Sequence, residues 1–308
     1  MYGPLCTART SIKSFLIYSC GVLNAFGKKT ASPTWKVYCG DCVAGMEQLI
    51  TPASVDVVVT SPPYNLGKDY TSYNDNKSPE EYLAWCQEWG SQIAKSLKED
   101  GSLFLNIGAS SGNLLFPFEV ARRISSCGLI LQNTIHWIKS ISIERDETTE
   151  SYGHFKPINS ARYLNDCQEY VFHFTKQGRT ELNRLAIGVP YADKSNIKRW
   201  GHTNGKDKRC RGNTWFIPYK TINERAKERP HPATFPIELA VKCIRLHGTK
   251  SCVVMDPFLG IGHSAYAAQE CSDLVSEFIG FDVDEEYLKV ACNRLQCSAT
   301  VIPQEICA

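Results

Sequence analysis

The chain lacks a long apolar stretch: nowhere in its 308 residues is there an apolar run of about 18, so the sequence excludes a transmembrane helix. It also lacks the cysteine density of a small disulfide scaffold, because its 14 cysteines are scattered along the chain. Cys39 and Cys42 form a C-x-x-C pair, but no second such pair and no paired histidines accompany them, so no metal site is predicted. Scattered thiols of this kind are typical of a reduced, intracellular protein.

Acidic residues are absent from the first 40 positions, which carry five basic residues. Residues 194–229 are also strongly basic, with eleven lysines and arginines against three acids. Because the net charge of the whole chain is only +2, the remainder is acidic. A basic block on an acidic body predicts a surface that binds a polyanion. The candidate phosphate contacts are Lys198, Arg199, Lys206, Lys208, Arg209 and Arg211.

The two ends of the chain differ from its body. Residues 1–34 are basic, acid-free and rich in serine and threonine, which is typical of an organellar targeting peptide. An untargeted extension or a misassigned start codon is the alternative interpretation. Residues 298–308 show no periodic pattern and are predicted to be a loose tail.

From residue 35 onward, predicted strands alternate with predicted helices, and this alternation indicates an α/β fold with a doubly wound, mostly parallel sheet. The rhythm lapses between about residues 141 and 230, apart from one strand. The predicted strands are 35–39, 55–60, 102–107, 130–138, 169–175, 251–255 and 278–282. The predicted helices are 43–50, 78–98, 118–126, 236–246, 264–270 and 285–295.

A first chemical motif, Ser61-Pro62-Pro63-Tyr64, directly follows the β-branched strand 55–60. In an open α/β sheet, ligands bind at the carboxyl ends of the strands. The prolines hold the backbone rigid and keep carbonyls that can accept hydrogen bonds, while Ser61 adds an acceptor and Tyr64 a flat face. These groups suit a planar ligand with an NH2 donor, such as a nucleic-acid base, although a Pro-rich turn is the plain alternative.

A second motif, Asp256-Pro257-Phe258-Leu259-Gly260-Ile261-Gly262, lies between a strand and a helix. Its glycines permit close approach of a ligand to a helix N-terminus. Asp282 ends the next strand, where an acid can accept hydrogen bonds from ribose hydroxyls. A dinucleotide site has a third glycine where Ala265 stands, so the pattern favours a ribose-bearing cofactor other than NAD.

Together the two motifs resemble those of the S-adenosylmethionine-dependent DNA amino-methyltransferases. Because the Ser-Pro-Pro-Tyr motif precedes the cofactor motif, the order is similar to the permuted class, in which the target-recognition region lies between them. Further similar segments are Tyr38–Cys42, His231–Pro236 and Ile279–Asp282, so the resemblance covers about residues 35–297. It implies a base-site half at 35–140, a target-recognition region at 141–230 that includes one core strand, and a cofactor half at 231–297.

The resemblance also implies roles for individual residues. Ser61, Pro62, Pro63 and Tyr64 match the positions that hold and stack the target base, and His231–Pro236 resembles a segment that covers the cofactor. His263 stands where the family commonly has threonine, and it is expected to face solvent, while Ser264 keeps a hydroxyl able to cap the helix. The positions that match S-adenosylmethionine contacts are Asp41, Asp256, Phe258, Gly260, Gly262 and Asp282.

The implied reaction is methylation of an exocyclic base amine in DNA. Acceptance of hydrogen bonds by Ser61 and the Pro62 carbonyl would localise the lone pair of the amine, and only the face of Tyr64 is expected to serve. Methylation of carbon 5 of cytosine is not favoured, because no proline in the chain precedes a cysteine nucleophile. The basic residues named above would contact DNA phosphates, and the protein would lie with DNA inside the cell: in the cytoplasm or nucleoid of a bacterium, or in a nucleus or organelle.

The identity of the base is the main alternative left open. Serine in the first motif position resembles the N4-cytosine enzymes, whereas N6-adenine enzymes more often carry aspartate or asparagine there. N4-cytosine is therefore favoured, with N6-adenine as the alternative and a non-catalytic nucleic-acid module as a further one. RNA or protein glutamine methylation is disfavoured by the motif order. A homodimer, a cognate restriction enzyme and the recognition sequence are left open.

Overall fold

The computed structural model describes residues 22–23, 29–30, 32–68, 72–110, 112–145, 148–153, 155, 160–218 and 234–302. Most of the predicted extension at 1–34 lies outside these residues, as do His231–Ala233 and the basic block beyond residue 218. Within the extension, the structure places a short antiparallel pair, β1 (Val22–Leu23) with β2 (Lys29–Thr30). The targeting prediction therefore stays a prediction.

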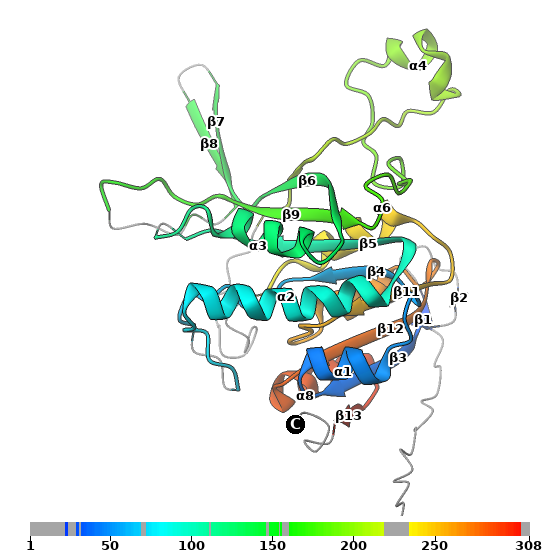
Figure 1. The fold of residues 1–308 in the computed structure, drawn as a ribbon. Helices are drawn as coiled ribbons and strands as arrows, with labels where there is room; N and C mark the ends of the chain where they lie inside the picture. The colour runs from blue at the N-terminus through cyan, green and yellow to red at the C-terminus, as the bar shows by residue number, and fades with distance from the viewer. Residues whose placement is uncertain are drawn as a thin grey trace, which may run out of the picture.

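One sheet organises the described residues. Its strand order is β10-β6-β9-β5-β4-β11-β12-β3-β13, and all neighbours are parallel except that β9 runs antiparallel to β5 and β6. The α/β fold with a mostly parallel sheet is thus confirmed (Figure 1). The strands are β3 (Thr34–Cys39), β4 (Val55–Thr60), β5 (Leu97–Ile107), β6 (Ile130–Ile138), β9 (Gln168–Thr175), β10 (Thr214–Phe216), β11 (Cys252–Asp256), β12 (Val275–Asp282) and β13 (Ala299–Val301).

Helices cover both faces of the sheet. Side chains of α1, α2 and α3 pack with Val58 on one face, and side chains of α6, α7 and α8 pack with Val57 and Val59 on the other. Strand β4 is buried along its whole length for this reason, as its β-branched sequence predicts. The helices are α1 (Cys42–Leu49), α2 (Pro79–Ser96), α3 (Phe116–Ser125), α6 (Ile237–His247), α7 (His263–Glu270) and α8 (Glu285–Leu295).

Helix α2 shows why the sequence specifies these elements locally. Ser78 accepts a hydrogen bond from the backbone N–H of Glu81, whose side chain accepts one from the backbone of Ser78, forming a capping box ahead of Pro79. The helix ends at Ser96, two residues before the predicted end, because β5 begins at Leu97. None of the helices in the described residues is long and apolar enough to cross a bilayer.

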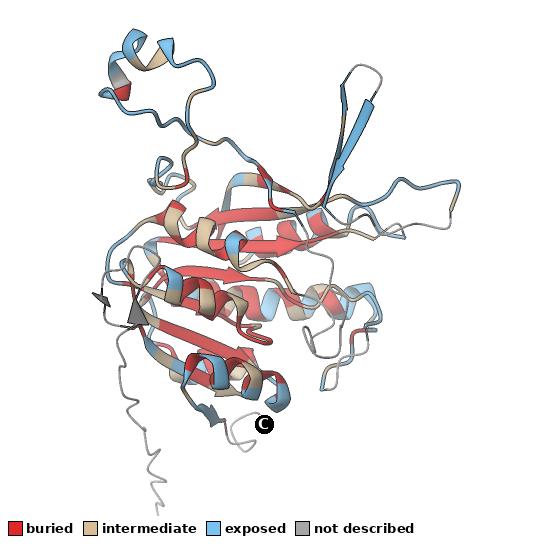
Figure 2. Cartoon of the chain, turned by 180° about the vertical axis from the view of Figure 1, so that it is seen from behind, coloured by how far each residue is buried: buried red, intermediate tan, exposed pale blue. Residues whose placement is uncertain are grey.

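The region between residues 141 and 218 contains more structure than the sequence predicts. A hairpin of β7 (Ile141–Arg145) and β8 (Thr148–Tyr152) projects from the body, and β10 joins the edge of the main sheet beside β6. A basic lobe, residues 194–211, carries α4 (Ser195–Arg199) and η1 (Gly201–Thr203). Figures 1 and 2 show the hairpin and the basic lobe rising from the same side of the molecule. The hairpin rises near one end of the strands and the lobe near the other end.

The prediction of a loose C-terminal tail is wrong for residues 299–302. Strand β13 pairs in parallel with β3, and Ile302 is buried against the backbone of Gly40 and Gly45. A side chain at Gly45 would lie 2.6 Å from the Phe281 ring and 2.9 Å from Ile302. The sequence pattern does not reveal this strand, because three residues at a sheet edge show no periodicity.

Candidate active site

The two sequence motifs meet because β4 and β11 are neighbours at the centre of the sheet. Val57 pairs with Val254 and Val58 with Met255, although the paired residues are almost 200 positions apart in the chain. The carboxyl ends of these parallel strands therefore lie side by side. They open into a cavity of about 430 Å³. The sequence-predicted residues that line it are Asp41, Ser61, Pro62, Pro63, Tyr64, Phe258, Gly260 and Asp282.

Asp282 occupies the centre of one half of this cavity, which we call the cofactor half. One carboxylate oxygen accepts a hydrogen bond from the backbone N–H of Gly260 at 2.7 Å, and the other accepts one from that of Asp284 at 2.8 Å. Burial raises the pKa of Asp282 to about 6, although these two hydrogen bonds lower it. Its neighbours Asp284 and Asp256 add to the increase. A ligand hydroxyl that donates to this carboxylate would therefore relieve an unfavourable buried charge.

The walls of the cofactor half are formed by backbone and aromatic rings. Gly260 adopts a left-handed conformation with φ of 53°, which favours glycine and exposes the turn backbone. The Phe258 ring packs edge-on against Trp85 and Trp89 of α2, with centroids 5.4 Å and 5.6 Å apart. Asp41 caps α1 by accepting a hydrogen bond from Ala44 at 2.9 Å. An acidic acceptor, a tight glycine turn and apolar walls fit a ribose-bearing cofactor such as S-adenosylmethionine.

Asp256 and Gly262 do not line the cavity, in contrast to the sequence prediction. The Asp256 carboxylate is 1% exposed and accepts hydrogen bonds from Thr60 at 2.6 Å, from the Phe258 backbone at 3.0 Å and from the Ser264 hydroxyl. Asp256 therefore joins the ends of β4 and β11 and shapes the turn from behind. Burial raises its pKa to about 6 despite these bonds. Nor does Ser264 cap α7, because its hydroxyl is committed to Asp256.

Gly262 serves the packing of α7 against α8. It has φ of 89°, and a Cβ added there would lie 2.9 Å from the Cβ of Ala291. A substitution such as Gly262→Val would therefore strain the backbone and clash with α8, so it tests folding rather than cofactor contact.

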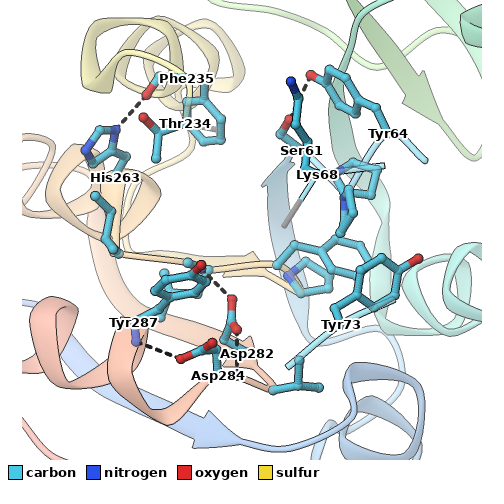
Figure 3. A pocket seen from close by; sticks show the side chains of 18 of the residues that line it. Ser61, Tyr64, Lys68, Tyr73, Thr234, Phe235, His263, Asp282, Asp284 and Tyr287 are labelled. Atoms are coloured by element: carbon cyan, nitrogen blue, oxygen red, sulfur yellow. Dashed lines mark hydrogen bonds between the residues drawn. The ribbon is translucent and has the colours of Figure 1, made fainter. Parts of the chain in front are cut away.

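His263 is the second correction in this half. The sequence predicts that it faces solvent, but it lines the cavity and its Nδ1 donates to the backbone carbonyl of Phe235 at 2.7 Å (Figure 3). Thr234 and Phe235, the described part of the segment expected to cover the cofactor, also line the cavity. The histidine thus ties the start of α7 to this segment. The threonine that the family commonly has at this position is too short to reach the Phe235 carbonyl. The family motif therefore does not predict this hydrogen bond.

Ser61 and Tyr64 are in the other half, which we call the base half. The Ser61 hydroxyl and the Tyr64 hydroxyl are 2.9 Å apart (Figure 3). The Tyr64 hydroxyl also lies 3.0 Å from Oε2 of Glu169 and 2.9 Å from Nδ2 of Asn106. The sequence predicts a role only for the face of Tyr64, and the structure adds that its hydroxyl is the centre of a polar network.

Three members of this network are not predicted from the sequence. Asn106 is the second-last residue of β5, Lys139 follows β6, and Glu169 is the second residue of β9. Lys139 forms ion pairs with Glu169 at 3.2 Å and with Asp166 at 3.5 Å. Burial opposes the charge of Lys139, but these two carboxylates raise its pKa above the ordinary value. The sequence does contain a signal for two of the three members, because each is a charged residue beside or near the end of a strand: Lys139 follows β6, and Glu169 lies near the start of β9.

The basic lobe does not line the cavity. Lys198, Arg199, Lys206, Lys208 and Arg209 are exposed on it, whereas Arg211 is partly buried and donates to the Ile187 carbonyl at 3.0 Å. Lys194 pairs with Asp207 across the lobe at 2.6 Å. Among the described residues, no three His, Cys, Asp or Glu side chains are grouped so as to hold a metal ion.

Comparisons with known proteins agree with this geometry. A family model described as N6_N4_Mtase, DNA methylase, matches residues 55–293. The type II methyltransferase M.HpaI of Haemophilus parainfluenzae is 24% identical over 264 residues, which cover 84% of this chain and 74% of the relative. The DNA adenine methyltransferase YhdJ of Escherichia coli K12 is 24% identical over 274 residues, which cover 87% and 84%.

Two solved structures share the fold. The PvuII DNA methyltransferase, described as cytosine-N4-specific, aligns with a TM-score of 0.60 and 19% identity, covering 90% of this chain and 91% of its own. The complex of M1.HpyAVI with S-adenosylmethionine aligns with a TM-score of 0.51 and 19% identity, covering 85% and 100%. At these identities the likeness establishes the fold alone.

Proposed function

The chain belongs to the N6_N4_Mtase family of DNA methylases, and from this membership we propose that it methylates the exocyclic N4 amine of cytosine in DNA. As a DNA methyltransferase of this family it uses S-adenosylmethionine as the methyl donor. The observation that carries the choice of base is the neutral hydroxyl of Ser61, which lies at the cavity and within hydrogen-bond distance of Tyr64.

Binding of the cofactor would fall to the half of the cavity around Asp282. Asp282 would accept hydrogen bonds from the ribose hydroxyls, Asp41 would lie near the adenine, and Phe258 and Gly260 would face the methionine part. When bound, S-adenosylmethionine supplies an electrophilic methyl group on a positively charged sulfur. Asp256 would act on this site indirectly, by holding the turn of Gly260 against the end of β4.

The base half would then have to make a poor nucleophile reactive. The lone pair of an exocyclic amine is delocalised into its ring. Acceptance of its two N–H hydrogen bonds by Ser61 and by the Pro62 carbonyl would localise the lone pair on nitrogen as the C–N bond to the ring lengthens. Fixed acceptors of this kind need no reorganisation during the reaction, which is the main source of their catalytic effect.

A cytosine inside a duplex cannot reach this cavity, so it must rotate out of the helix at a cost of a few kcal/mol. Stacking on the Tyr64 ring would offset about 1–3 kcal/mol of that cost. The exposed residues of the basic lobe, Lys198, Arg199, Lys206, Lys208 and Arg209, are the proposed phosphate contacts, with Arg211 as a weaker candidate. In this proposal, residues 141–230 form the target-recognition region between the two halves of the catalytic domain.

Methylation of adenine N6 is the second candidate, and the likeness to the DNA adenine methyltransferase YhdJ favours it. Adenine presents the same NH2 donor to Ser61, so the amine acceptors alone do not separate the two bases. Cytosine is preferred here because Ser61 in the first motif position resembles the N4-cytosine enzymes, whereas N6-adenine enzymes more often carry aspartate or asparagine there.

Analysis of methylated nucleosides tests the proposal directly. DNA treated with the protein and S-adenosylmethionine is digested to nucleosides and measured by mass spectrometry. N4-methylcytosine is the expected product. N6-methyladenine as the sole product would overturn the choice of base, and 5-methylcytosine would overturn amine chemistry altogether.

A further inference from the structure

A chain of hydrogen bonds leads from the cavity into the sheet. It begins at the Ser61 hydroxyl, passes through the Tyr64 hydroxyl at 2.9 Å, and ends at Oε2 of Glu169, 3.0 Å further on. The Glu169 side chain is 17% exposed, so its carboxylate is largely withdrawn from solvent. The three residues come from the loop after β4 and from the start of β9, more than 100 positions apart in the chain.

The direction of each hydrogen bond in this chain follows from the carboxylate. A carboxylate can only accept, so the Tyr64 hydroxyl donates its proton to Glu169. The Tyr64 oxygen then accepts, both from Asn106 Nδ2 at 2.9 Å and from the Ser61 hydroxyl. The proton of Ser61 is thereby directed away from the cavity, and its oxygen lone pairs are presented to a donor such as a base amine.

Asn106 and Lys139 hold Glu169 in this position. Asn106 is 3% exposed and donates to Oε2 of Glu169 at 2.6 Å, while Lys139 pairs with Oε1 at 3.2 Å. The backbone is also adapted to the contact. A Cβ at Gly108 would lie 3.0 Å from Cγ of Glu169 and 3.3 Å from Cε2 of Tyr64, so glycine leaves the space in which the two side chains meet.

Glu169 reaches Tyr64 because β9 runs against its neighbours. Tyr170 pairs with Ile107, so the first residues of β9 lie beside the last residues of β5. If β9 were parallel to its neighbours, its first residues would lie at the opposite ends of the strands from the cavity. Because β9 is reversed, it places a carboxylate beside the carboxyl ends of the other strands.

We propose that Glu169 takes up the proton that methylation of the amine releases, through Tyr64 and Ser61; this inference rests on the proposed function. As the amine nitrogen forms its bond to the methyl carbon, the bond from that carbon to sulfur breaks and its electron pair stays on sulfur. The nitrogen then carries one surplus proton. That proton passes to the Ser61 oxygen, the Ser61 proton passes to Tyr64, and the Tyr64 proton passes to Glu169. The amine becomes neutral and the carboxylate becomes a carboxylic acid, which later loses its proton to solvent.

The main test is Glu169→Gln, measured as single-turnover methyl transfer with cofactor and DNA saturating. Glutamine keeps the shape and an oxygen that accepts from Tyr64, but it cannot take up a proton. Loss of a general base lowers kcat by about 10²–10⁴-fold, and we expect KM for both substrates to stay within about twofold. A rate within about threefold of the wild type would overturn the inference.

A second measurement separates proton transfer from positioning. Wild-type transfer should be slower in heavy water than in light water, because several protons move along the chain. Glu169→Gln should abolish this difference. A variant that is slow but retains the full solvent isotope effect would show that Glu169 only positions Tyr64, and would overturn its role as proton acceptor.

Tyr64→Phe provides an independent variant, since it breaks the chain and keeps the ring. We expect it to be as slow as Glu169→Gln, and the double variant to be no slower than either single one. Additive losses would contradict a shared path.

Glu277→Gln is the matched control, because Glu277 is also paired with a lysine, Lys36, and is similarly shielded at 24% exposure, but lies outside the cavity. Thermal unfolding of all variants separates these effects from misfolding.

Nucleoside analysis of the wild type keeps the two hypotheses distinguishable. If the wild type produces no N4-methylcytosine, the proposed function fails. If the wild type produces N4-methylcytosine and Glu169→Gln produces it equally fast, the proton path fails and the proposed function stands.

Discussion

The two halves of the cavity are built in different ways. The cofactor half is centred on the turn between β11 and α7 and on the end of the adjoining strand at Asp282, which are joined by hydrogen bonds between backbone and side chain. The base half is joined mainly through side chains, and its hydrogen bond between Tyr64 and Glu169 links residues 105 positions apart; the other members are Ser61, Asn106 and Lys139. One half is a local structure that any parallel strand pair can carry, whereas the other requires the whole order of the sheet.

The halves also differ in how they treat buried charge. In the cofactor half, the carboxylate of Asp282 accepts from the backbone N–H groups of Gly260 and Asp284, and burial raises its pKa to about 6. In the base half, the carboxylate of Glu169 is balanced by Lys139 and Asn106. The cofactor half therefore offers a buried carboxylate to a ligand that donates hydrogen bonds. In the base half the carboxylate already has side-chain partners, although Oδ1 of Asn106 is buried without a hydrogen-bond partner among the described residues. Substitutions placed in one half at a time test this difference.

Among the substitutions that compare the two halves, Ser61→Ala should have the largest effect. Removing one fixed hydrogen-bond acceptor from the reacting amine costs about 2.7–4 kcal/mol of barrier, or 10²–10³ in rate. Cofactor affinity should be unchanged, because Ser61 belongs to the base half. Single-turnover kinetics and calorimetry measure the two quantities on the same preparation. Equal losses in rate and in cofactor binding would show that the halves are not separable.

Asp282→Asn should have the converse effect on the cofactor half. Hydrogen bonds to charged groups contribute about 1.5–3 kcal/mol, so affinity for S-adenosylmethionine should fall by about 10- to 150-fold. Calorimetry measures this, and DNA binding should stay unchanged. Asp273→Asn is the control, because Asp273 forms an ion pair with Arg245 away from the cavity. Unaltered cofactor affinity in Asp282→Asn would contradict its placement.

The pH dependence of cofactor binding should reveal the same carboxylate. With its pKa near 6, Asp282 is mostly protonated at pH 5 and mostly ionised at pH 7. Only the ionised form accepts from both ribose hydroxyls, so affinity should rise by close to tenfold over that interval. For the protein without ligand the sign is reversed: a raised pKa contributes stability below about pH 4, and this contribution is lost as the pH rises through about 6.

Calorimetry across this pH range provides the measurement, and Asp282→Asn should remove the dependence. Asp256 also has a pKa near 6, but it lies behind the turn and does not line the cavity. A pH dependence that persists in Asp282→Asn would therefore assign the titration to Asp256 and to the shape of the turn.

The smallest effect is expected at the basic lobe, which belongs to neither half. Replacing Lys208 and Arg209 by glutamate should weaken DNA binding at every sequence alike. The salt slope of the affinity should fall by about 0.9 for each phosphate that the variant no longer neutralises. Fluorescence anisotropy at several salt concentrations measures the slope. Arg211 is a poor choice for this test, because it is tied to the Ile187 carbonyl. An unaltered slope would show that the lobe is only a solvated surface.

Local sequence determined the parts that depend on neighbouring residues. The β-branched run of β4, the capping box of α2 and the glycine turn after β11 are all predicted with bounds within a few residues, because each is stabilised by contacts inside a short segment. Short edge strands such as β10 and β13 are not predicted, because their stability comes from the neighbouring strand and not from their own pattern.

The sequence by itself thus determined that two motifs lie at strand ends, and it predicts a chemistry for each of them. Only the tertiary structure decided that they share one cavity, through the pairing of β4 with β11, and that Glu169 completes it, through the reversal of β9. It also decided that the Asp256 carboxylate is buried behind the turn, where it joins the ends of β4 and β11. The physical reason is that burial and side-chain partners depend on the order of strands in space, which no short segment encodes.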